Sequence, residues 1–317
     1  MLTTRLTQKF GLQYPIMSSP MAGHSNGSFA AAVSNAGGMG LFGATLLSPE
    51  RMQQELEVAR SQTEKPFGVG FITMSLPNDE AQFRIALETQ PAAIAFSFDD
   101  PAPWAARTRD AGITAICQVQ SLQSAREAVA AGAEVLVAQG REAGGHTGSP
   151  SLIALLGEVL DAFPDHIVLA AGGIAGGRAL AAVLAAGADG AWMGTRLLAT
   201  PEAIVPDEHK RLIVESRAED TVFTPVYDIV AGGRWPRNVE ARLLRNRFAA
   251  EWTGRERELE DRLADVQASN AAARAIDPWQ NQAVYMGTGV SAIHSIEPLA
   301  DVIRSICEDA ERRLTRP

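Results

Sequence analysis

Cysteine, long apolar runs and basic clusters are all scarce in this sequence of 317 residues. The two cysteines, Cys117 and Cys307, lie far apart, so neither a disulfide framework nor a metal-ligand spacing is expected. So little cysteine fits a reducing compartment. The longest apolar stretch, residues 167–177, has 11 residues, which is too short to cross a bilayer. Because the N-terminal residues contain no apolar signal-peptide core, we expect a cytoplasmic protein that binds neither a metal nor a membrane.

Aromatic residues make up only 6% of the chain, whereas 46% of it is hydrophobic and alanine and glycine are abundant. Small residues let helices pack closely on strands, so this composition favours an α/β protein over a β-sandwich. The formal net charge is −9 and the pI is about 5.2. Because no basic patch stands out, we do not expect nucleic-acid binding.

One structural unit, a helix followed by glycine and a strand, recurs along the chain. In each copy a polar-faced helical segment ends in Ala-Gly and a short apolar run follows. Four copies span residues 31–43, 107–118, 125–140 and 179–194. Glycine is the usual residue just after a helix. A continuous apolar run bounded by glycine indicates a strand that is buried on both faces, and therefore a parallel one.

Eight apolar runs of this kind are present. They are residues 14–17, 39–42, 67–71, 93–96, 114–118, 135–138, 167–170 and 190–193. Eight strands with intervening helices close a (β/α)8 TIM barrel. The helix over residues 49–61 has a clear start signal, because Ser48 can cap it and Pro49 suits its first position. The rival fold, a doubly wound open sheet, lacks its glycine-rich phosphate fingerprint here.

After the eighth strand the pattern changes. Residues 220–275 are charged and read as helical, with too few apolar residues for an independent core. We therefore expect one barrel, built from residues 1–219 and 276–317, with residues 220–275 as a helical insertion or lid. A plain pair of solvated helices is the alternative. The last helix places five apolar residues on one face, which favours packing on the barrel wall. An exposed terminal helix could also mediate a homodimer. The five residues are Leu299, Val302, Ile303, Ile306 and Ala310.

In a barrel, the functional residues lie on loops at the carboxyl ends of the strands. The loop after the sixth run, residues 139–148, is rich in glycine and carries one histidine, His146. Imidazole titrates near neutrality, so this residue is the best candidate for an acid, a base or a hydrogen-bond donor. His24, on the loop after the first run, is the second candidate. The small residues and the proline of residues 18–23 let a flat ligand approach the backbone closely.

The loops after the seventh and eighth runs, residues 171–178 and 193–196, predict a phosphate site. Glycine exposes backbone N–H groups there, and these two loops are the usual phosphate position in such barrels. Arg178 and Arg196 either neutralise the phosphate or pair with surface carboxylates. The phosphate could belong to FMN or to a phosphorylated substrate.

The end of the fifth run offers two candidates, Cys117 and Gln118. Alternation along a strand points only one of them into the barrel. We interpret Gln118 as the residue at the rim and Cys117 as a small buried hydrophobe.

Several of these segments match a known family. Residues 139–148, Gln-Gly-Arg-Glu-Ala-Gly-Gly-His-Thr-Gly, resemble the signature of nitronate monooxygenases, formerly called 2-nitropropane dioxygenases. Residues 171–175 and 193–196 look like the family's phosphate-site segments, and residues 14–22 resemble its N-terminal strand and flavin loop. The resemblance covers most of the chain up to about residue 200, and again residues 296–307. It implies a TIM barrel with FMN bound non-covalently at its top.

The resemblance also implies a role for each candidate residue. The flavin ring would lie along Pro20, Met21 and Ala22 and would be backed by Gly144 and Gly145. Gln118 would contact the ring or the ribityl chain. The phosphate would be held by Ala171, Gly172, Gly173, Gly194 and Thr195. His146 would face the substrate. Gly70 stands where relatives often carry Asn, so a side-chain hydrogen bond is lost at that position.

The implied reaction oxidises an alkyl nitronate with O2 to a carbonyl compound and nitrite. Two alternatives within the same superfamily are a flavin NAD(P)H:quinone reductase and an FMN-dependent enoyl reductase. Missing dinucleotide fingerprints do not exclude either, because these barrels do not use one. A third alternative is a flavin-free barrel that isomerises or cleaves a phosphorylated metabolite, which fits the phosphate glycines equally well but the loops of Pro20 and His146 less well.

Overall fold

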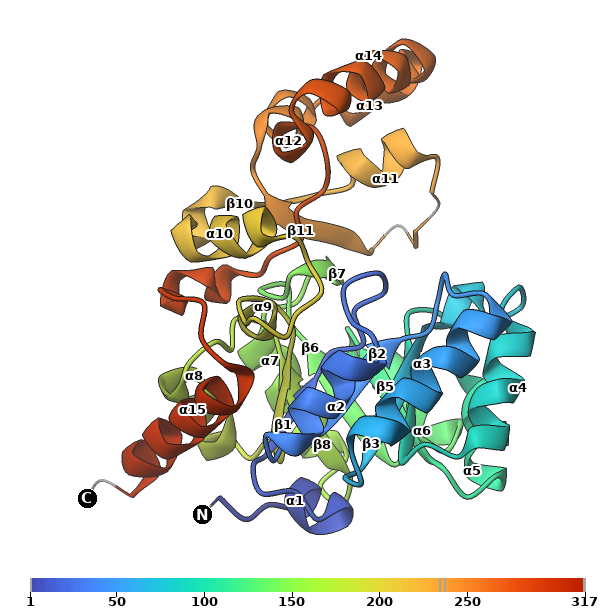
Figure 1. Ribbon diagram of the computed structural model, residues 1–317, viewed down its shortest axis with the longest axis vertical. Coiled ribbons are helices and arrows are strands. Elements are labelled where there is room, and N and C mark those ends of the chain that lie inside the picture. Colours follow the sequence, from blue (N-terminus) through green and yellow to red (C-terminus); the bar gives the residue numbers. More distant parts are fainter. Residues whose placement is uncertain (1, 234, 237, 316–317) are drawn as a thin grey trace.

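The apolar runs of the repeat form eight parallel strands at the centre of the molecule (Figure 1). They are β1 (Ile16–Ser18), β2 (Gly40–Gly43), β3 (Phe67–Ile72), β4 (Ala93–Ser97), β5 (Thr114–Val119), β6 (Val135–Gln139), β8 (Ile167–Ala171) and β9 (Gly190–Met193). A parallel bridge between Met17 and Met39 joins β1 to β2, and β1 also pairs with β9. The sheet therefore closes on itself, which confirms the (β/α)8 barrel. The computed structural model describes residues 2–233, 235–236 and 238–315.

Eight helices surround these strands. They are α2 (Gly27–Asn35), α3 (Pro49–Gln62), α4 (Glu80–Thr89), α5 (Ala102–Asp110), α6 (Leu122–Ala130), α7 (Leu152–Ala162), α8 (Gly177–Ala185) and α15 (Leu299–Leu314). The predicted start of α3 is confirmed, because the Ser48 side chain accepts a hydrogen bond from the Arg51 N–H and Pro49 is the first helical residue.

The eighth helix of the ring comes from far along the chain. The helix that follows β9 directly, α9 (Thr195–Leu198), has only one turn. Helix α15 takes the outer position instead and packs against both α8 and α2. A Cβ atom at Gly177 would lie 2.7 Å from the Ile306 carbonyl oxygen, so glycine permits this close approach. The apolar face predicted for the last helix is buried, which confirms that it packs on the barrel wall.

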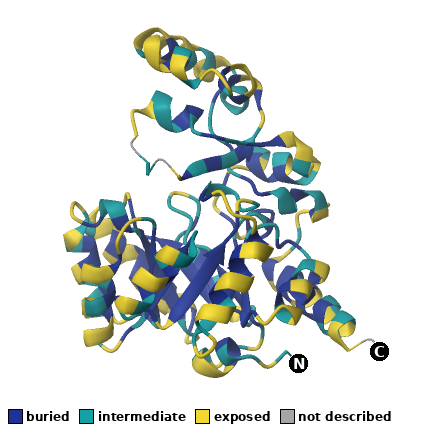
Figure 2. Cartoon of the chain, turned by 180° about the vertical axis from the view of Figure 1, so that it is seen from behind, coloured by how far each residue is buried: buried dark blue, intermediate teal, exposed yellow. Residues whose placement is uncertain are grey.

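Side chains alternate along the barrel strands between two cores. One core lies inside the barrel and includes Leu41, Ile116 and Trp192. The other fills the space between strands and helices, so that the strands are buried on both sides and exposed residues gather on the outer helix faces (Figure 2). Cys117 belongs to the outer core, as predicted, and burial raises the pKa of its thiol to about 12. Gln118 consequently points to the inside of the barrel.

The described residues of the segment 220–275 form a layer over one end of the barrel, and we call them the lid (Figure 1). Its helices are α11 (Val226–Ala231), α12 (Arg247–Trp252), α13 (Glu256–Asp261) and α14 (Leu263–Ile276). The lid is not purely helical, because β10 (Thr221–Thr224) and β11 (Glu240–Leu244) pair antiparallel within it. The expectation that the lid has too few apolar residues for a core was also wrong. Val226, Leu243, Phe248 and others form a separate buried cluster.

A third strand of the lid's sheet comes from the loop after β6. This strand, β7 (Gly145–Thr147), pairs antiparallel with β11, and His146 lies opposite Ala241. The sheet order is therefore β10-β11-β7. Sequence reasoning treated residues 139–148 as a loop, because three residues between glycines give no periodic signal. In the part of the chain that the structure describes, no helix has the length and apolar character needed to cross a membrane.

Candidate active site

A cavity of about 740 Å³ opens at the carboxyl ends of the barrel strands, under the lid. Its volume lies within the range of sites that bind cofactors and other small ligands. Every residue to which the resemblance assigns a role lines it. These residues are Pro20, Met21, Ala22, Gly70, Gln118, Gly144, Gly145, His146, Ala171, Gly172, Gly173, Gly194 and Thr195. The structure thus brings all of them together, whereas their individual roles stay predictions.

The loop after β1 forms one wall of the cavity beside Gly70. A Cβ atom at Gly70 would lie 2.2 Å from Cγ of Pro20, so any larger residue would displace the proline ring. A Cβ atom at Gly43 would likewise lie 2.6 Å from the Ala22 backbone nitrogen. The glycine at position 70 is therefore matched to Pro20 by packing, in addition to lacking the hydrogen bond of an asparagine.

The proposed phosphate end of the cavity is built from backbone. Gly172 and Gly173 have φ values of 118° and 69°, which side chains rarely adopt. Sequence reasoning missed a third segment, residues 287–289, which also contributes to the lining. The Gly287 N–H donates a hydrogen bond of 3.0 Å to Thr195 Oγ1, and a Cβ atom at Gly289 would lie 3.2 Å from the Gly173 carbonyl carbon. Its two glycines, Gly287 and Gly289, are the sequence signal that could have identified it.

Neither arginine considered for the phosphate lines the cavity. Arg178 is exposed. The guanidinium of Arg196 donates to the carbonyl oxygens of Ala199 and Ser295 and lies 3.8 Å from Glu297. Arg196 is thus engaged in holding the chain segment before α15. Any anion at this end would rely on backbone N–H groups and on the Thr195 hydroxyl.

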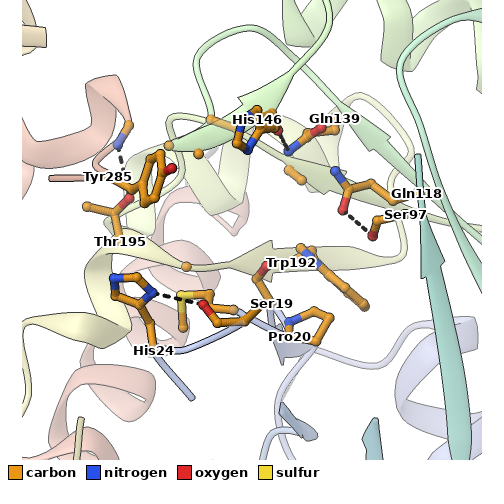
Figure 3. A pocket seen from close by; sticks show the side chains of 18 of the residues that line it. Ser19, Pro20, His24, Ser97, Gln118, Gln139, His146, Trp192, Thr195 and Tyr285 are labelled. Carbon is orange, nitrogen blue, oxygen red and sulfur yellow. Dashed lines mark hydrogen bonds between the residues drawn. The ribbon is translucent and has the colours of Figure 1, made fainter. Parts of the chain in front are cut away.

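Two hydrogen-bond donors on the barrel side of the cavity have no partner. Among the described residues, Gln118 Nε2 and Trp192 Nε1 are buried atoms that make no hydrogen bond within the chain. The other end of the Gln118 amide is fixed, because its Oε1 accepts a hydrogen bond of 2.8 Å from Ser97 Oγ (Figure 3). Buried donors are rarely left unsatisfied. A ligand with acceptor atoms over this surface would satisfy both, and the flavin ring system is such a ligand.

His146 also lines the cavity and is held by the lid. Its Nε2 atom lies 2.9 and 3.0 Å from the two carboxylate oxygens of Asp228 on α11. The indole of Trp235 stacks on the imidazole, with ring centroids 3.6 Å apart and planes 13° from parallel. Gln139 Nε2 donates a hydrogen bond of 3.0 Å to the His146 carbonyl oxygen (Figure 3). Asp228 and Trp235 were missed because the lid gave no motif.

His24, the second histidine candidate, lines the cavity near Tyr285. One of its ring nitrogens, Nδ1, lies 3.0 Å from the Ala22 carbonyl oxygen, so it bonds the backbone and not a carboxylate. Tyr285 presents its hydroxyl to the cavity (Figure 3). Burial, together with the charge of Asp228, raises the pKa of this hydroxyl to about 12. Tyr285 therefore remains a neutral donor at any working pH.

A third histidine, His209, packs behind these residues. Its Nε2–H donates a hydrogen bond of 3.3 Å to the Tyr285 carbonyl oxygen, and its ring meets His24 edge-on at 5.7 Å. Burial, with a smaller contribution from the charge of His24, lowers the pKa of His209 from 6.5 to about 4. His209 thus stays neutral in the folded protein over the whole physiological range.

The buried His209 makes stability depend on pH. Above pH 6.5 the ring is neutral in both the folded and the unfolded state, so it has no effect on the pH dependence. As the pH falls from 6.5 towards 4, only the unfolded chain binds the proton, and we expect a loss of about 3 kcal/mol in the free energy of unfolding. Urea denaturation at pH ~7.5 and ~4.5 measures this loss. His209→Gln keeps an N–H donor but does not titrate, so its loss should be smaller; equal losses would refute the assignment.

Comparisons with known proteins agree on one family. The nitronate monooxygenase family profile matches residues 3–309. A Mycobacterium tuberculosis protein named (3aS,4S,5R,7aS)-5-hydroxy-7a-methyl-1-oxo-octahydro-1H-indene-4-carboxyl-CoA dehydrogenase is 32% identical over 229 residues, covering 72% of this chain. The matched region spans only 64% of that relative.

Two solved structures are similar over nearly their whole length. FabK from Thermotoga maritima has a TM-score of 0.88 at 30% identity, covering 99% of this chain and 98% of that chain. Nitroalkane oxidase from Streptomyces ansochromogenes has a TM-score of 0.81 at 30% identity, covering 97% and 98%. With the family profile spanning almost all of the sequence, the chain belongs to the nitronate monooxygenase family.

Proposed function

We propose that this protein is an FMN-dependent oxidoreductase that oxidises nitro compounds, as alkyl nitronates or nitroalkanes, with O2 to a carbonyl compound and nitrite. One observation carries the proposal. A histidine lines a ligand-sized cavity whose wall also presents two buried donors without partners, Gln118 Nε2 and Trp192 Nε1. This arrangement suits a flat, acceptor-rich cofactor at the donors and a substrate at the histidine. The family and the likeness to nitroalkane oxidase support the choice of substrate.

The residues present fit a bound flavin. Gln118 and Trp192 would donate to its ring or ribityl acceptors, and the loop of Pro20 would lie along one face. The phosphate would lie against Gly173 and Thr195, where backbone N–H groups replace the missing cations. FMN supplies the two-electron chemistry when it is bound, and the protein supplies binding and orientation.

The chain's own contribution to the reaction centres on His146. With a nitronate, the imidazole in its protonated form would hold the negatively charged oxygens by a hydrogen bond from Nδ1. With a neutral nitroalkane, it would take the α-proton as a general base. The Tyr285 hydroxyl, neutral at working pH, would offer a further donor to the nitro group. The lid would exclude water from His146 and Tyr285.

A second candidate function is the reduction of a carbon–carbon double bond or a quinone with NAD(P)H. The likeness to FabK, with a TM-score of 0.88, and the dehydrogenase name of the Mycobacterium tuberculosis relative favour it. This function keeps the cavity and the cofactor and changes both the donor and the acceptor of the electrons, from a nitro compound and O2 to NAD(P)H and a quinone or double bond.

Anaerobic reduction of the flavin separates these functions. Purified holoenzyme is mixed with propyl nitronate, with nitroethane or with NADH, and the visible absorbance of the oxidised flavin is followed. We expect a nitro compound to bleach the flavin and NADH to leave it oxidised. Bleaching by NADH alone would assign the protein to the reductase function. A protein that stays colourless after addition of FMN would instead favour a flavin-free barrel.

A further inference from the structure

The backbone of His146 pairs with the lid strand β11, although its carbonyl oxygen also accepts a hydrogen bond from Gln139 of the barrel strand β6. Its strand, β7, pairs only with β11 in the described sheets, with His146 opposite Ala241. The side chain is also held by lid residues, Asp228 and Trp235. The position and orientation of the imidazole therefore depend on the lid being in place over the cavity.

The contact with Asp228 determines which ring nitrogen carries a proton. A carboxylate only accepts hydrogen bonds, so Nε2, which lies 2.9 and 3.0 Å from its oxygens, must be the N–H nitrogen. In the neutral ring, the basic lone pair is then on Nδ1. Both side chains are well shielded, with 12% of His146 and 13% of Asp228 exposed. Shielding from water makes this hydrogen bond a strong constraint.

Asp228 also determines the charge of the site. Among the described residues that line the cavity it is the only carboxylate, and no lysine or arginine is among them. A ligand that contacts His146 therefore meets a negative charge without a compensating cation. An anionic substrate is repelled at this position, whereas a neutral one is not.

We propose that Asp228 is a positioning residue for His146, and that it makes the site select a neutral nitroalkane over its anion, the nitronate. The inference rests on the proposed function for its substrate class. In the step, the C–H bond next to the nitro group breaks and its proton moves to Nδ1 of His146. The electron pair stays on the substrate and is delocalised into the nitro group. Asp228 stabilises the resulting imidazolium, as a carboxylate does for a catalytic histidine in other enzymes.

Asp228→Asn tests the proposal, because it preserves the shape of the side chain and removes its charge. We expect kcat with nitroethane to fall roughly 10²-fold or more, with little change in KM. With ethyl nitronate prepared in advance, we expect kcat/KM to rise by about tenfold, because a repelling charge is gone. Glu251→Gln removes one charge from an exposed position of the lid and should change neither value. Equal losses with both substrates would show a merely structural role and overturn the proposal.

A measurement without turnover keeps the two proposals separate. Nitrogen NMR of labelled holoenzyme, assigned with His146→Asn, reports which ring nitrogen carries the proton. We expect Nε2 of His146 to carry the proton in the wild type. In Asp228→Ala we expect the preference for this tautomer to be lost. An unprotonated Nε2 would overturn the positioning role. If the wild type oxidises neither nitro compound, the proposed substrate fails and the selection with it, and the NMR result still decides whether Asp228 positions His146.

Discussion

Gly173→Asp is expected to fold and to purify without flavin. The residue lies at the proposed phosphate end of the cavity, where a Cβ atom would have ordinary contacts of 3.4 Å with Glu142 and 3.5 Å with Thr288. The substitution therefore places a carboxylate beside the phosphate without crowding the loop. Two unit charges ~4 Å apart repel by about 4 kcal/mol at an effective dielectric constant of ~20. FMN binding should weaken by roughly 10³-fold.

Gly11→Asp is the matched control for this variant. Its φ of 65° is close to the 69° of Gly173, so both variants carry the same backbone strain. Gly11 caps α1 (Arg5–Phe10), and nothing lies within 4 Å of a Cβ atom there. Visible absorbance of the purified proteins gives the flavin content, and the denaturation midpoint confirms folding. Full flavin content in Gly173→Asp would refute the phosphate site.

His146→Asn is expected to keep its flavin and to lose most turnover of neutral nitroalkanes. The imidazole hydrogen-bonds Asp228 and makes no hydrogen bond to Gln118 or Trp192, so its removal leaves the proposed cofactor contacts intact. Asparagine can still hydrogen-bond but cannot accept the α-proton. The loss of a general base lowers kcat by roughly 10²- to 10⁴-fold. Steady-state oxygen consumption with nitroethane measures this loss.

The control for His146→Asn is the same substitution at His166. That residue lies outside the cavity and packs edge-on against Phe163. It should keep both the flavin and the turnover. Unchanged turnover in His146→Asn would remove His146 from the mechanism, whereas loss of flavin would show that the residue holds the cofactor.

The barrel was predictable because its signals are local. Each strand is a short apolar run, and some helices carry their own start signal, as Ser48 and Pro49 show for α3. Alternation along β5 was enough to direct Gln118 inward and Cys117 outward. The glycine-rich ends of β6, β8 and β9 placed a large part of the cavity lining for the same reason.

The remainder of the site depends on contacts between distant segments. Asp228 is 82 residues from His146, and neither lies in a motif that points to the other. Strand β11 was read as helical because Glu240 and Arg242 make it look charged, whereas its alternate residues Ala241 and Leu243 are buried. Its pairing with β7 is long-range, and such pairing leaves no periodic trace in the sequence. The segment at residues 287–289 was missed because it follows the lid.

The origin of the eighth barrel helix has a consequence for synthesis of the protein. Helix α15 closes the wall between α8 and α2, yet it follows the lid in the sequence. During synthesis, all eight barrel strands and the whole lid therefore leave the ribosome while the apolar faces of α8 and α2 are still exposed to solvent. Uncovered apolar surface of this kind promotes aggregation. A ribosome that stalls while it translates the lid would thus leave a nearly complete barrel whose α8 and α2 expose apolar surface. Chaperones would have to cover this surface until residues 299–314 are synthesised.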